Sequence, residues 1–255
     1  NQPQKLIGKR VLITSGSTIE PVDPIRFISN RSSGKQGASI ASALYNLGAE
    51  VIVISGPSSV PIANGISVIK VETAEQMFNT VMTQKNLDAA ICVAAVADWR
   101  VKEVSKKKLK KGSETEMNLA LVQNRDILKE ISNLADRPKL VVGFAAETCE
   151  VIDYATKKRK SKNCDWIIAN DLSNPTNIMG GDSNTVSLIT EDGIEHWPKL
   201  SKAEVGEKLA EKACELRAFL KNVFQSEVDR RLKSFHFKGG SWMRRKNPSS
   251  ICSRH

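Results

Sequence analysis

The fold is constrained most by short apolar runs, rich in Val and Ile, that alternate along the chain with segments of helical periodicity. Neither face of these runs is polar, which is typical of strands buried on both sides. The six runs are RVLITSG, EVIVISG, SVIKV, AAICVAAVAD, KLVVGFAAE and DWIIAND. Helices are predicted between them near Gly37–Leu47, from about Thr73 to Lys85, after Asn124, and from about Val151 to Lys162. In the second of these, Thr73 and Gln76 are spaced as a capping box. Because parallel strands need crossover connections, the alternation predicts an α/β fold with a mostly parallel sheet and helices on both faces.

The last third of the chain departs from this alternation. TVSLIT followed by EDGIEHW predicts a small antiparallel hairpin with a turn at Asp192-Gly193, and Ser201 to about Leu220 predicts a last amphipathic helix. Beyond roughly Phe224 no period is sustained and the segment is basic. We therefore predict one folded domain, residues 1–222, followed by a basic, disordered tail, residues 223–255. An arm for nucleic acid or a membrane surface is the alternative for the tail.

Composition argues against several classes of protein. With 255 residues, 40% of them hydrophobic, the chain can build a sizeable core, but no apolar run approaches the ~18–20 residues that span a membrane. The first residues, NQPQKLIGKR, lack the apolar middle of a signal peptide. Five Cys are scattered without a CxxC pair, and three His offer no metal-ligand spacing. We expect a cytoplasmic protein whose own side chains hold no metal.

The net charge of +10 suggests a nucleic-acid partner until the charges are located. From Lys221 to the end there are nine Lys or Arg and two acidic residues, a surplus of seven. The remaining +3 belongs to residues 1–220. Because nucleic-acid binding calls for a basic face on the folded domain itself, no such partner is expected for the body of the protein.

Ligands of open parallel sheets bind beyond the carboxyl ends of the strands, so the segments after each strand are candidate sites. After the first strand, ISNRSSGKQG is no P-loop, because Ser29 stands where a Gly is needed and Gln36 where a hydroxyl must follow the Lys. Backbone amides around Ser32–Gly34 are expected near a helix start, where they attract anions; a capped helix with a surface loop is equally consistent. The amide of Asn30 can both donate to and accept from a reacting acyl group.

After the fourth strand, AAVADWRVKEVSKKKLKKGSE combines small residues, Asp98 at the strand end, and five Lys between Lys106 and Lys111. Small side chains let a flat ligand approach the backbone closely. The lysines can neutralise a triphosphate during group transfer. A solvated charged loop is the simpler alternative.

Three further segments carry weaker signals. Asn124 or Asp126 opens a predicted helix, where it either caps the helix or reads the edge of a base. Phe144 ends the next strand and either stacks on a flat ring or belongs to the core. Lys158 and Lys162 share one face of a helix whose other charges fit a merely solvated surface equally well.

Taken together, ISNRSSGKQG, AAVADWR, KKLKK, GFAAET and the AND turn, in this order, resemble phosphopantothenoylcysteine synthetase, from about Gly8 to Leu220. The resemblance implies a Rossmann-like doubly wound fold, a homodimer, and a ligase that joins 4′-phosphopantothenate to L-cysteine in coenzyme A biosynthesis. It further implies that CTP activates the substrate carboxylate as an acyl-cytidylate with release of pyrophosphate, that the cysteine amine displaces CMP, and that the nucleotide phosphates hold Mg²⁺. In most bacteria such a domain follows a flavin-dependent decarboxylase half, which is therefore an expected partner.

The resemblance also implies roles for individual residues. The implied catalytic residues are Asn30, which handles the acyl-cytidylate, and Lys108, which opens the KxKK motif and contacts the triphosphate. The implied substrate-binding residues are Asn30, Ser32, Ser33, Gly34 and Lys35. The implied nucleotide-binding residues are Cys92, Val93, Ala94, Asp98, Lys108, Arg125, Asp126, Ile127, Leu128, Phe144, Lys158 and Lys162. Two positions depart from the family pattern: Arg125 replaces the Pro of an Asn-Pro-Asp-Ile motif, and a Gly usual near Cys92 is missing.

Two other functions are weighed against this ligase. A nicotinamide-dependent oxidoreductase uses the same fold class, but it turns from the first strand into a helix through GxGxxG, whereas about twenty residues intervene here. A nucleic-acid-binding protein would use the basic tail. The sequence shows no Ser-His-Asp or Cys-His set, which suits a ligase whose nucleophile is the amine of its own substrate.

Overall fold

The computed structural model describes residues 4–111, 115–173 and 183–216. Residues up to Glu211 form one compact unit, and a second unit begins at Lys212. The predicted tail, and the domain boundary at residues 222 and 223, lie outside the described residues and stay predictions. Within the described ranges, no helix is both long enough and apolar enough to traverse a lipid bilayer.

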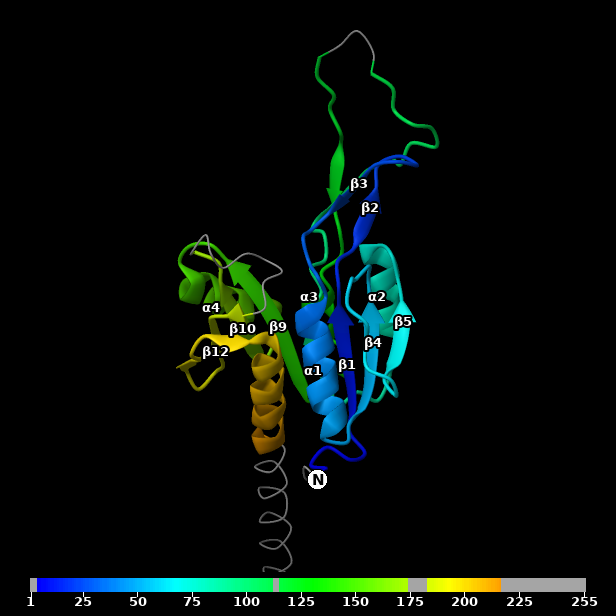
Figure 1. Ribbon diagram of the computed structural model, residues 1–255. Coiled ribbons are helices and arrows are strands. Elements are labelled where there is room, and N and C mark those ends of the chain that lie inside the picture. The colour runs from blue at the N-terminus through cyan, green and yellow to red at the C-terminus, as the bar shows by residue number, and fades with distance from the viewer. Residues whose placement is uncertain (1–3, 112–114, 174–182, 217–255) are drawn as a thin grey trace, which may run out of the picture. The chain divides into compact units, whose positions relative to one another are not determined.

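An eight-stranded sheet forms the centre of the compact unit, in the order β13-β12-β10-β9-β6-β1-β4-β5 (Figure 1). Its strands are β1 (Arg10–Ser15), β4 (Glu50–Ser55), β5 (Ser67–Lys70), β6 (Ala89–Cys92), β9 (Leu140–Glu147), β10 (Trp166–Asp171), β12 (Val186–Ile189) and β13 (Ile194–His196). Neighbours from β5 to β10 pair in parallel, whereas β12 and β13 add an antiparallel edge. The predicted α/β fold, including the hairpin that turns at Asp192-Gly193, is confirmed.

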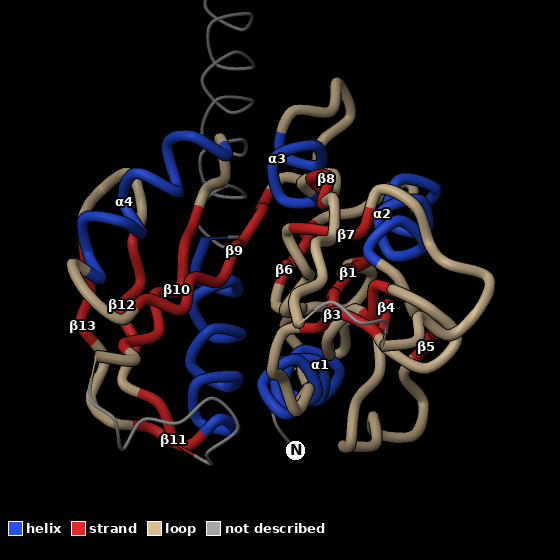
Figure 2. Tube along the Cα trace, turned by 90° about the horizontal axis from the view of Figure 1, so that it is seen from above, coloured by secondary structure: helices blue, strands red, loops and turns tan. Residues whose placement is uncertain are grey.

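The helices cover both faces of this sheet. They are α1 (Lys35–Asn46), α2 (Ala74–Thr83), α3 (Ile127–Ser132), α4 (Val151–Lys162) and a last helix over residues 202–216. Figure 2 shows α1 on the face opposite to α2 and α3, as right-handed crossovers in opposite directions along the sheet require. The predicted capping box starts α2, because the Thr73 side chain accepts the Gln76 N–H while the Gln76 side chain accepts the Thr73 N–H.

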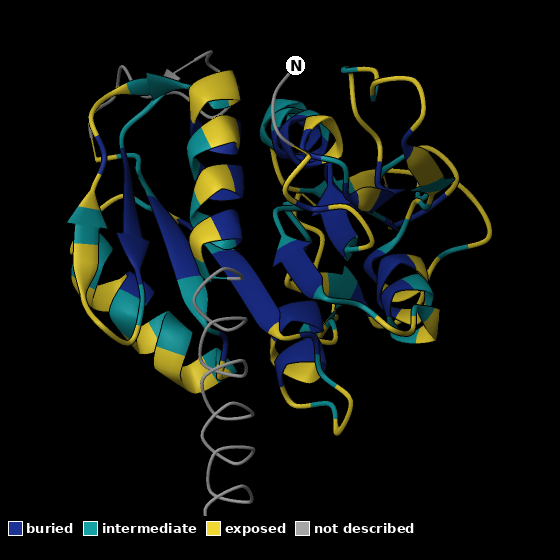
Figure 3. Ribbon diagram, turned by 90° about the horizontal axis from the view of Figure 1, so that it is seen from below, coloured by how far each residue is buried: buried dark blue, intermediate teal, exposed yellow. Residues whose placement is uncertain are grey.

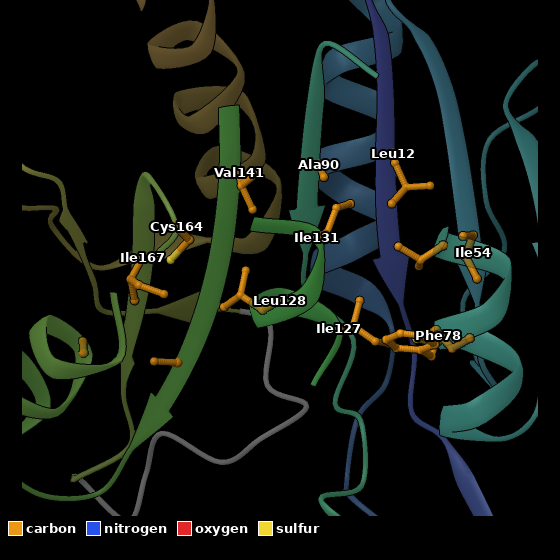
Figure 4. Close-up of a cluster of buried hydrophobic side chains, with 14 of the residues drawn as sticks. Leu12, Ile54, Phe78, Ala90, Ile127, Leu128, Ile131, Val141, Cys164 and Ile167 are labelled. Atoms are coloured by element: carbon orange, nitrogen blue, oxygen red, sulfur yellow. The ribbon is translucent and has the colours of Figure 1, made fainter. Parts of the chain in front are cut away.

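Apolar side chains of the strands and of α2 and α3 form one core on the face of the sheet that α2 and α3 cover (Figure 4). Its members include Leu12, Ile54, Met77, Phe78, Ala90, Ile127, Leu128, Ile131, Val141 and Ile167. Each fully buried Leu or Ile stabilises the fold by roughly 1.5–3 kcal/mol relative to an exposed one. Figure 3 shows the buried strands between helices whose outer faces are exposed.

Two strand predictions are corrected. The run SVIKV was expected to be buried on both faces, but β5 is an edge strand and Val68 is 39% exposed. The run AAICVAAVAD was expected to be one strand, but β6 ends at Cys92. The backbone then curves along the end of β1, where Val93 N–H donates to the Thr14 carbonyl at 3.2 Å and Ala95 N–H to the Gly16 carbonyl at 2.9 Å. These bonds hold the chain beside the end of β1, with an isolated parallel bridge between Ser17 and Ala95, after the regular strand has ended.

Three small antiparallel pairs were not predicted. They are β2 (Ile19–Pro21) with β3 (Phe27–Ser29), β7 (Trp99–Val101) with β8 (Leu121–Gln123), and β11 (Ser183–Asn184) with β14 (Leu200–Ser201). The first two pairs extend beyond the carboxyl ends of the sheet strands (Figure 1). We call residues 19–29, 99–111 and 115–123 the arm. Its large apolar side chains that are more than 40% exposed are Ile25, Phe27, Trp99, Val104, Met117, Leu119 and Leu121.

Candidate active site

The strand order creates a topological switch point between β1 and β6. From β1 the chain moves outward through β4 to β5, and then returns to the other side of β1 as β6. The crossover helices therefore lie on opposite faces and leave a crevice at the carboxyl ends of these two strands. A cavity of about 620 Å³ lies at this place. The predicted site residues that line it are Asn30, Ser32, Ser33, Gly34, Lys35, Cys92, Val93, Ala94, Asp98, Arg125, Asp126, Ile127, Leu128, Phe144, Lys158 and Lys162.

One wall of the cavity is the start of α1. The helix begins two residues earlier than predicted, with Gly34 at its N-cap in the left-handed region (φ 76°). Gly37 lets the helix sit directly on the end of β1, because a Cβ there would lie 2.2 Å from Ser15 Oγ. The amide-rich end of α1 thus faces the cavity as expected, and its dipole favours an anion there.

Asn30 lies on the strand-end segment next to this helix start. Its Nδ2 donates to the Val96 carbonyl at 2.9 Å, which ties the segment after β3 to the loop after β6. The side-chain carbonyl Oδ1 is the remaining polar atom of the amide, and a neutral amide adds no charge to an anion-binding cavity.

The turn before α3 forms the opposite wall. Asn124 joins it to the loop after β6, since its Nδ2 donates to the Ala97 carbonyl at 2.8 Å and its N–H donates to the Asp98 carbonyl at 2.8 Å. Asp126 is the N-cap of α3 and accepts the Lys129 N–H at 2.8 Å. Arg125, at the position where the family motif has Pro, places its guanidinium 3.6 Å from the centroid of the Phe78 ring. Three consecutive side chains therefore hold this turn in place.

Two lysines of α4 approach the cavity from a third direction. They lie four residues apart on one face of the helix, as expected. Lys158 Nζ donates to the Phe144 carbonyl at 3.0 Å, and Lys162 Nζ pairs with the Asp126 carboxylate. These contacts hold both ammonium groups at the cavity.

The cavity carries a surplus of positive charge. Six cationic residues and two anionic residues line it. The cationic ones are Arg31, Lys35, Arg125, Lys158, Lys162 and Lys202, and the anionic ones are Asp98 and Asp126. A concave surface with a surplus of four positive charges concentrates anionic ligands. Burial raises the pKa of Cys92 to about 12, so its thiol is a neutral wall group near neutral pH.

Lys108 is the one predicted site residue that does not line the cavity. It belongs to the arm, between β7 and β8. The structure therefore brings sixteen predicted residues together and leaves Lys108 apart within one chain. Among the described residues, no group of three or more His, Cys, Asp or Glu is arranged to hold a metal ion.

Several lining residues escaped the sequence interpretation. They include Thr14, Arg31, Asn184 and Lys202. Asn184 and Lys202 come from the last strands and the last helix, where no local pattern points to a ligand. Gln36 joins them to α1, because it donates to the Lys202 carbonyl at 3.1 Å and accepts from Asn184 Nδ2 at 3.3 Å. Only the tertiary contact reveals them.

The Asp126–Lys162 pair should make stability depend on pH. Burial acts to raise the pKa of Asp126, but hydrogen bonds from Lys162 and from the Lys129 N–H outweigh it, so the pKa lies below the ordinary 3.8. A lowered pKa stabilises the fold above the unfolded-state value, and this contribution is lost as pH falls through the folded-state value. We expect D126N to be less stable than wild type at about pH 6 and the gap in unfolding free energy to be smaller at about pH 2, measured by urea unfolding.

The variant D136N is the control for this prediction. It removes an exposed pair in which Lys85 Nζ and Asp136 Oδ2 lie 3.6 Å apart, which contributes little in water. Its pH profile should follow that of wild type. An equal stability gap between D126N and wild type at both pH values would contradict the assignment.

The geometry can be compared with known proteins. The family described as "DNA/pantothenate metabolism flavoprotein C-terminal domain" matches residues 6–216. The curated "Coenzyme A biosynthesis bifunctional protein CoaBC" of Vibrio parahaemolyticus is 40% identical over 217 residues, which are 84% of this chain and 54% of that protein. The protein of the same name from Escherichia coli is 42% identical over 204 residues, 78% of this chain and 50% of that one. The chain spans about half the length of these relatives.

A solved structure gives the same result in three dimensions. The "Crystal structure of the C-terminal Domain of Coenzyme A biosynthesis bifunctional protein CoaBC" superimposes with a TM-score of 0.71 at 38% identity. The match covers 84% of this chain and 98% of that one. The likeness thus extends over nearly the whole of that domain.

Proposed function

Since the chain belongs to the DNA/pantothenate metabolism flavoprotein C-terminal domain family, we propose that it is a ligase of coenzyme A biosynthesis that joins 4′-phosphopantothenate to L-cysteine. Membership confirms the family resemblance expected from the five sequence motifs. The relatives are named for coenzyme A biosynthesis, and they support the pathway. The proposed reaction rests on the chemistry of the cavity.

The observation that carries the proposal is the convergence of cations from separate elements on one cavity. Lys35 comes from α1, Lys158 and Lys162 from α4, and Lys202 from the last helix. A ligase that brings a phosphorylated substrate and a nucleoside triphosphate together must offset many negative charges at one place. The cavity offers no ionised thiol, since the pKa of Cys92 is raised to about 12. Amide formation needs none, because the substrate supplies the amine.

We propose two chemical steps. In the first, a carboxylate oxygen of phosphopantothenate attacks the α-phosphorus of CTP, and the bond to the β-phosphate breaks and releases pyrophosphate. In the second, the cysteine amine attacks the acyl carbon of the acyl-cytidylate, CMP leaves with the bonding electron pair, and the nitrogen loses a proton. The activation is needed because a carboxylate does not react with an amine directly. In the acyl-cytidylate, a mixed anhydride, CMP is the leaving group.

The residues divide between these steps. Lys158 and Lys162 would hold the triphosphate, and Mg²⁺ bound by the phosphates would offset the remaining charge. The start of α1, with Ser32 to Lys35, would frame phosphopantothenate and the acyl-cytidylate. Ala94 lets the cytosine ring approach the backbone, and Phe144 offers a flat partner. Asn30, which lines the cavity, would contact the acyl group through its amide.

We also propose that the enzyme is a homodimer. The arm exposes Phe27, Trp99 and four further large apolar side chains besides Ile25, more than a solvated hairpin requires. A second copy could cover this surface and bring its own Lys108 to a cavity. A dimer would thus explain why Lys108 does not line the cavity of its own chain.

The relatives suggest a further partner. They are about twice as long as the matched segment and are named bifunctional. We propose a flavin-dependent decarboxylase half as the native companion of this domain, in the cytoplasm. That half would act on the phosphopantothenoylcysteine that this domain produces.

A coupled assay tests the proposed reaction. We expect pyrophosphate and CMP to appear in equal amounts when phosphopantothenate, cysteine, Mg²⁺ and CTP are all present, measured by enzymatic pyrophosphate detection and chromatography. Without cysteine, a burst of pyrophosphate no larger than the enzyme concentration is expected, because the acyl-cytidylate accumulates. Turnover with ATP instead of CTP would refute the proposed preference for CTP but would leave the proposed ligase activity standing. No turnover with either, together with NAD binding in a fluorescence titration, would favour the oxidoreductase.

A further inference from the structure

The turn between β2 and β3 contains a buried carboxylate that the reaction scheme does not use. The side chain of Asp23 is fully buried, although it lies in a hairpin turn of the arm. Its Oδ1 accepts the N–H groups of Ile25 at 2.8 Å and Arg26 at 2.9 Å, and so closes the turn. Its Oδ2 accepts Nε and Nη2 of Arg26 at 3.0 and 2.7 Å.

The same carboxylate reaches across to the lysine-rich segment. Leu109 N–H donates to Asp23 Oδ2 at 3.0 Å, although the residues are 86 positions apart in the sequence. Arg26 Nη2 in turn donates to the Leu109 carbonyl. Both backbone polar groups of Leu109 are therefore bound by one ion pair. Figure 1 shows the β2–β3 turn beside the chain that follows β7.

A second contact holds the segment at its start. Ser105 N–H donates to the Val22 carbonyl at 3.0 Å, and Ser105 Oγ donates to the Lys107 carbonyl at 2.6 Å. Lys108 is thus the residue between two anchored backbone positions. Five lysines within residues 106–111 repel one another, and such a run tends to extend into solvent unless its backbone is held.

The electrostatics agree with a permanently charged anchor. Burial acts to raise the pKa of Asp23, but the N–H groups of Leu109, Ile25 and Arg26 and the Arg26 side chain together hold it far below its ordinary value. A buried charge that is fully hydrogen-bonded fixes geometry more than it adds stability, because desolvation offsets much of the attraction. The Asp23 carboxylate is therefore suited to fix the position of the backbone at Leu109.

We propose that Asp23, together with Arg26, is a positioning residue that clamps the backbone at Leu109 and so presents Lys108 at a fixed point of the arm. The part of this inference that concerns catalysis rests on the proposed ligase, in which Lys108 contacts the triphosphate. The clamp itself is independent of that reaction.

Limited proteolysis of the full chain tests the clamp without any assay of activity. Trypsin cleaves after lysine, so D23N, which removes the charge and keeps the shape, should accelerate cleavage within residues 106–111 about tenfold or more. Mass spectrometry identifies the cleaved bonds, and cleavage elsewhere should keep its wild-type rate. The matched control is D192N, an exposed aspartate in the other hairpin turn, which should leave all rates unchanged. Cleavage of D23N within 106–111 at the wild-type rate would overturn the clamp.

A second variant guards against misfolding of D23N. L109P removes the N–H that Asp23 accepts and does not change either residue of the Asp23–Arg26 pair. It should likewise accelerate cleavage after Lys106, Lys107 and Lys110, while circular dichroism matches wild type. Unchanged cleavage of a folded L109P would also refute the clamp.

Turnover tests the link to Lys108. D23N and K108Q should each lower kcat, and the double variant D23N/K108Q should equal K108Q, because a clamp that acts only through Lys108 has nothing left to position. Losses that multiply would refute the positioning role. If K108Q keeps wild-type turnover, the proposed role of Lys108 fails, whereas the proteolysis result still decides the clamp.

Discussion

Replacing Lys158 by Gln is expected to lower the rate of pyrophosphate release about 100-fold to 1,000-fold, the loss found when one preorganised hydrogen-bond donor is removed from an oxyanion hole. Lys158 lies on the cavity face of α4, and its Nζ is fixed 3.0 Å from the Phe144 carbonyl. A fixed ammonium group needs no reorganisation when charge moves from the α-phosphorus to the departing pyrophosphate. Gln keeps most of the length but removes the charge.

The control for this prediction lies on the same helix. K160Q makes the same chemical change at an exposed position that does not line the cavity, and it should keep kcat/KM within about twofold of wild type. Both variants are compared by initial rates of pyrophosphate release over a range of CTP concentrations. Equal losses in K158Q and K160Q would mean that helix charge in general, rather than this contact, governs the rate.

Replacing Asn30 by Asp is expected to stall the enzyme before product. Asn30 Nδ2 donates to the Val96 carbonyl at 2.9 Å, and a carboxylate cannot donate, so two oxygens would face each other there. The new negative charge would also oppose an anionic acyl-cytidylate. We expect product formation to fall about 100-fold or more, while pyrophosphate release in the first turnover falls less.

Rapid-quench kinetics separate these two events. Enzyme, phosphopantothenate, CTP and cysteine are mixed and stopped at successive times, and pyrophosphate and phosphopantothenoylcysteine are quantified in each sample. N46D is the matched control, because it introduces the same charge at an exposed residue on the carboxyl end of α1, away from the active cavity. Product formation by N30D at the wild-type rate would remove Asn30 from the site.

Much of the fold was predictable because its signals are local. The predicted bounds of α4 match the structure, and the capping box at Thr73 and Gln76 marks the start of α2 as expected. The buried runs became β1, β4, β9 and β10, since Val and Ile on both faces are stable only between layers of helices. Each of these signals lies within about a dozen residues of the chain.

The failures share a non-local cause. The strands β7 and β8 have three residues each, and their pairing joins residues far apart in sequence, such as Trp99 and Gln123, which no local pattern relates. The same holds for burial: β5 has the composition of an inner strand, but among the described strands it has a neighbour on one side only. The cavity shows this too, because Lys202 and Asn184 carry no motif and reach it through Gln36 of α1.

The sequence by itself determined the periods of the elements, the fold class and the family, because apolar periodicity, capping and short motifs act between neighbours along the chain. Only the tertiary structure decided that β6 returns beside β1, and with it that cations from three helices surround one crevice while Lys108 is held on the arm. Strand order and side-chain convergence depend on contacts between residues far apart in sequence. The free energy of these contacts is shared among many residues from different segments, so no single segment of the sequence reveals it.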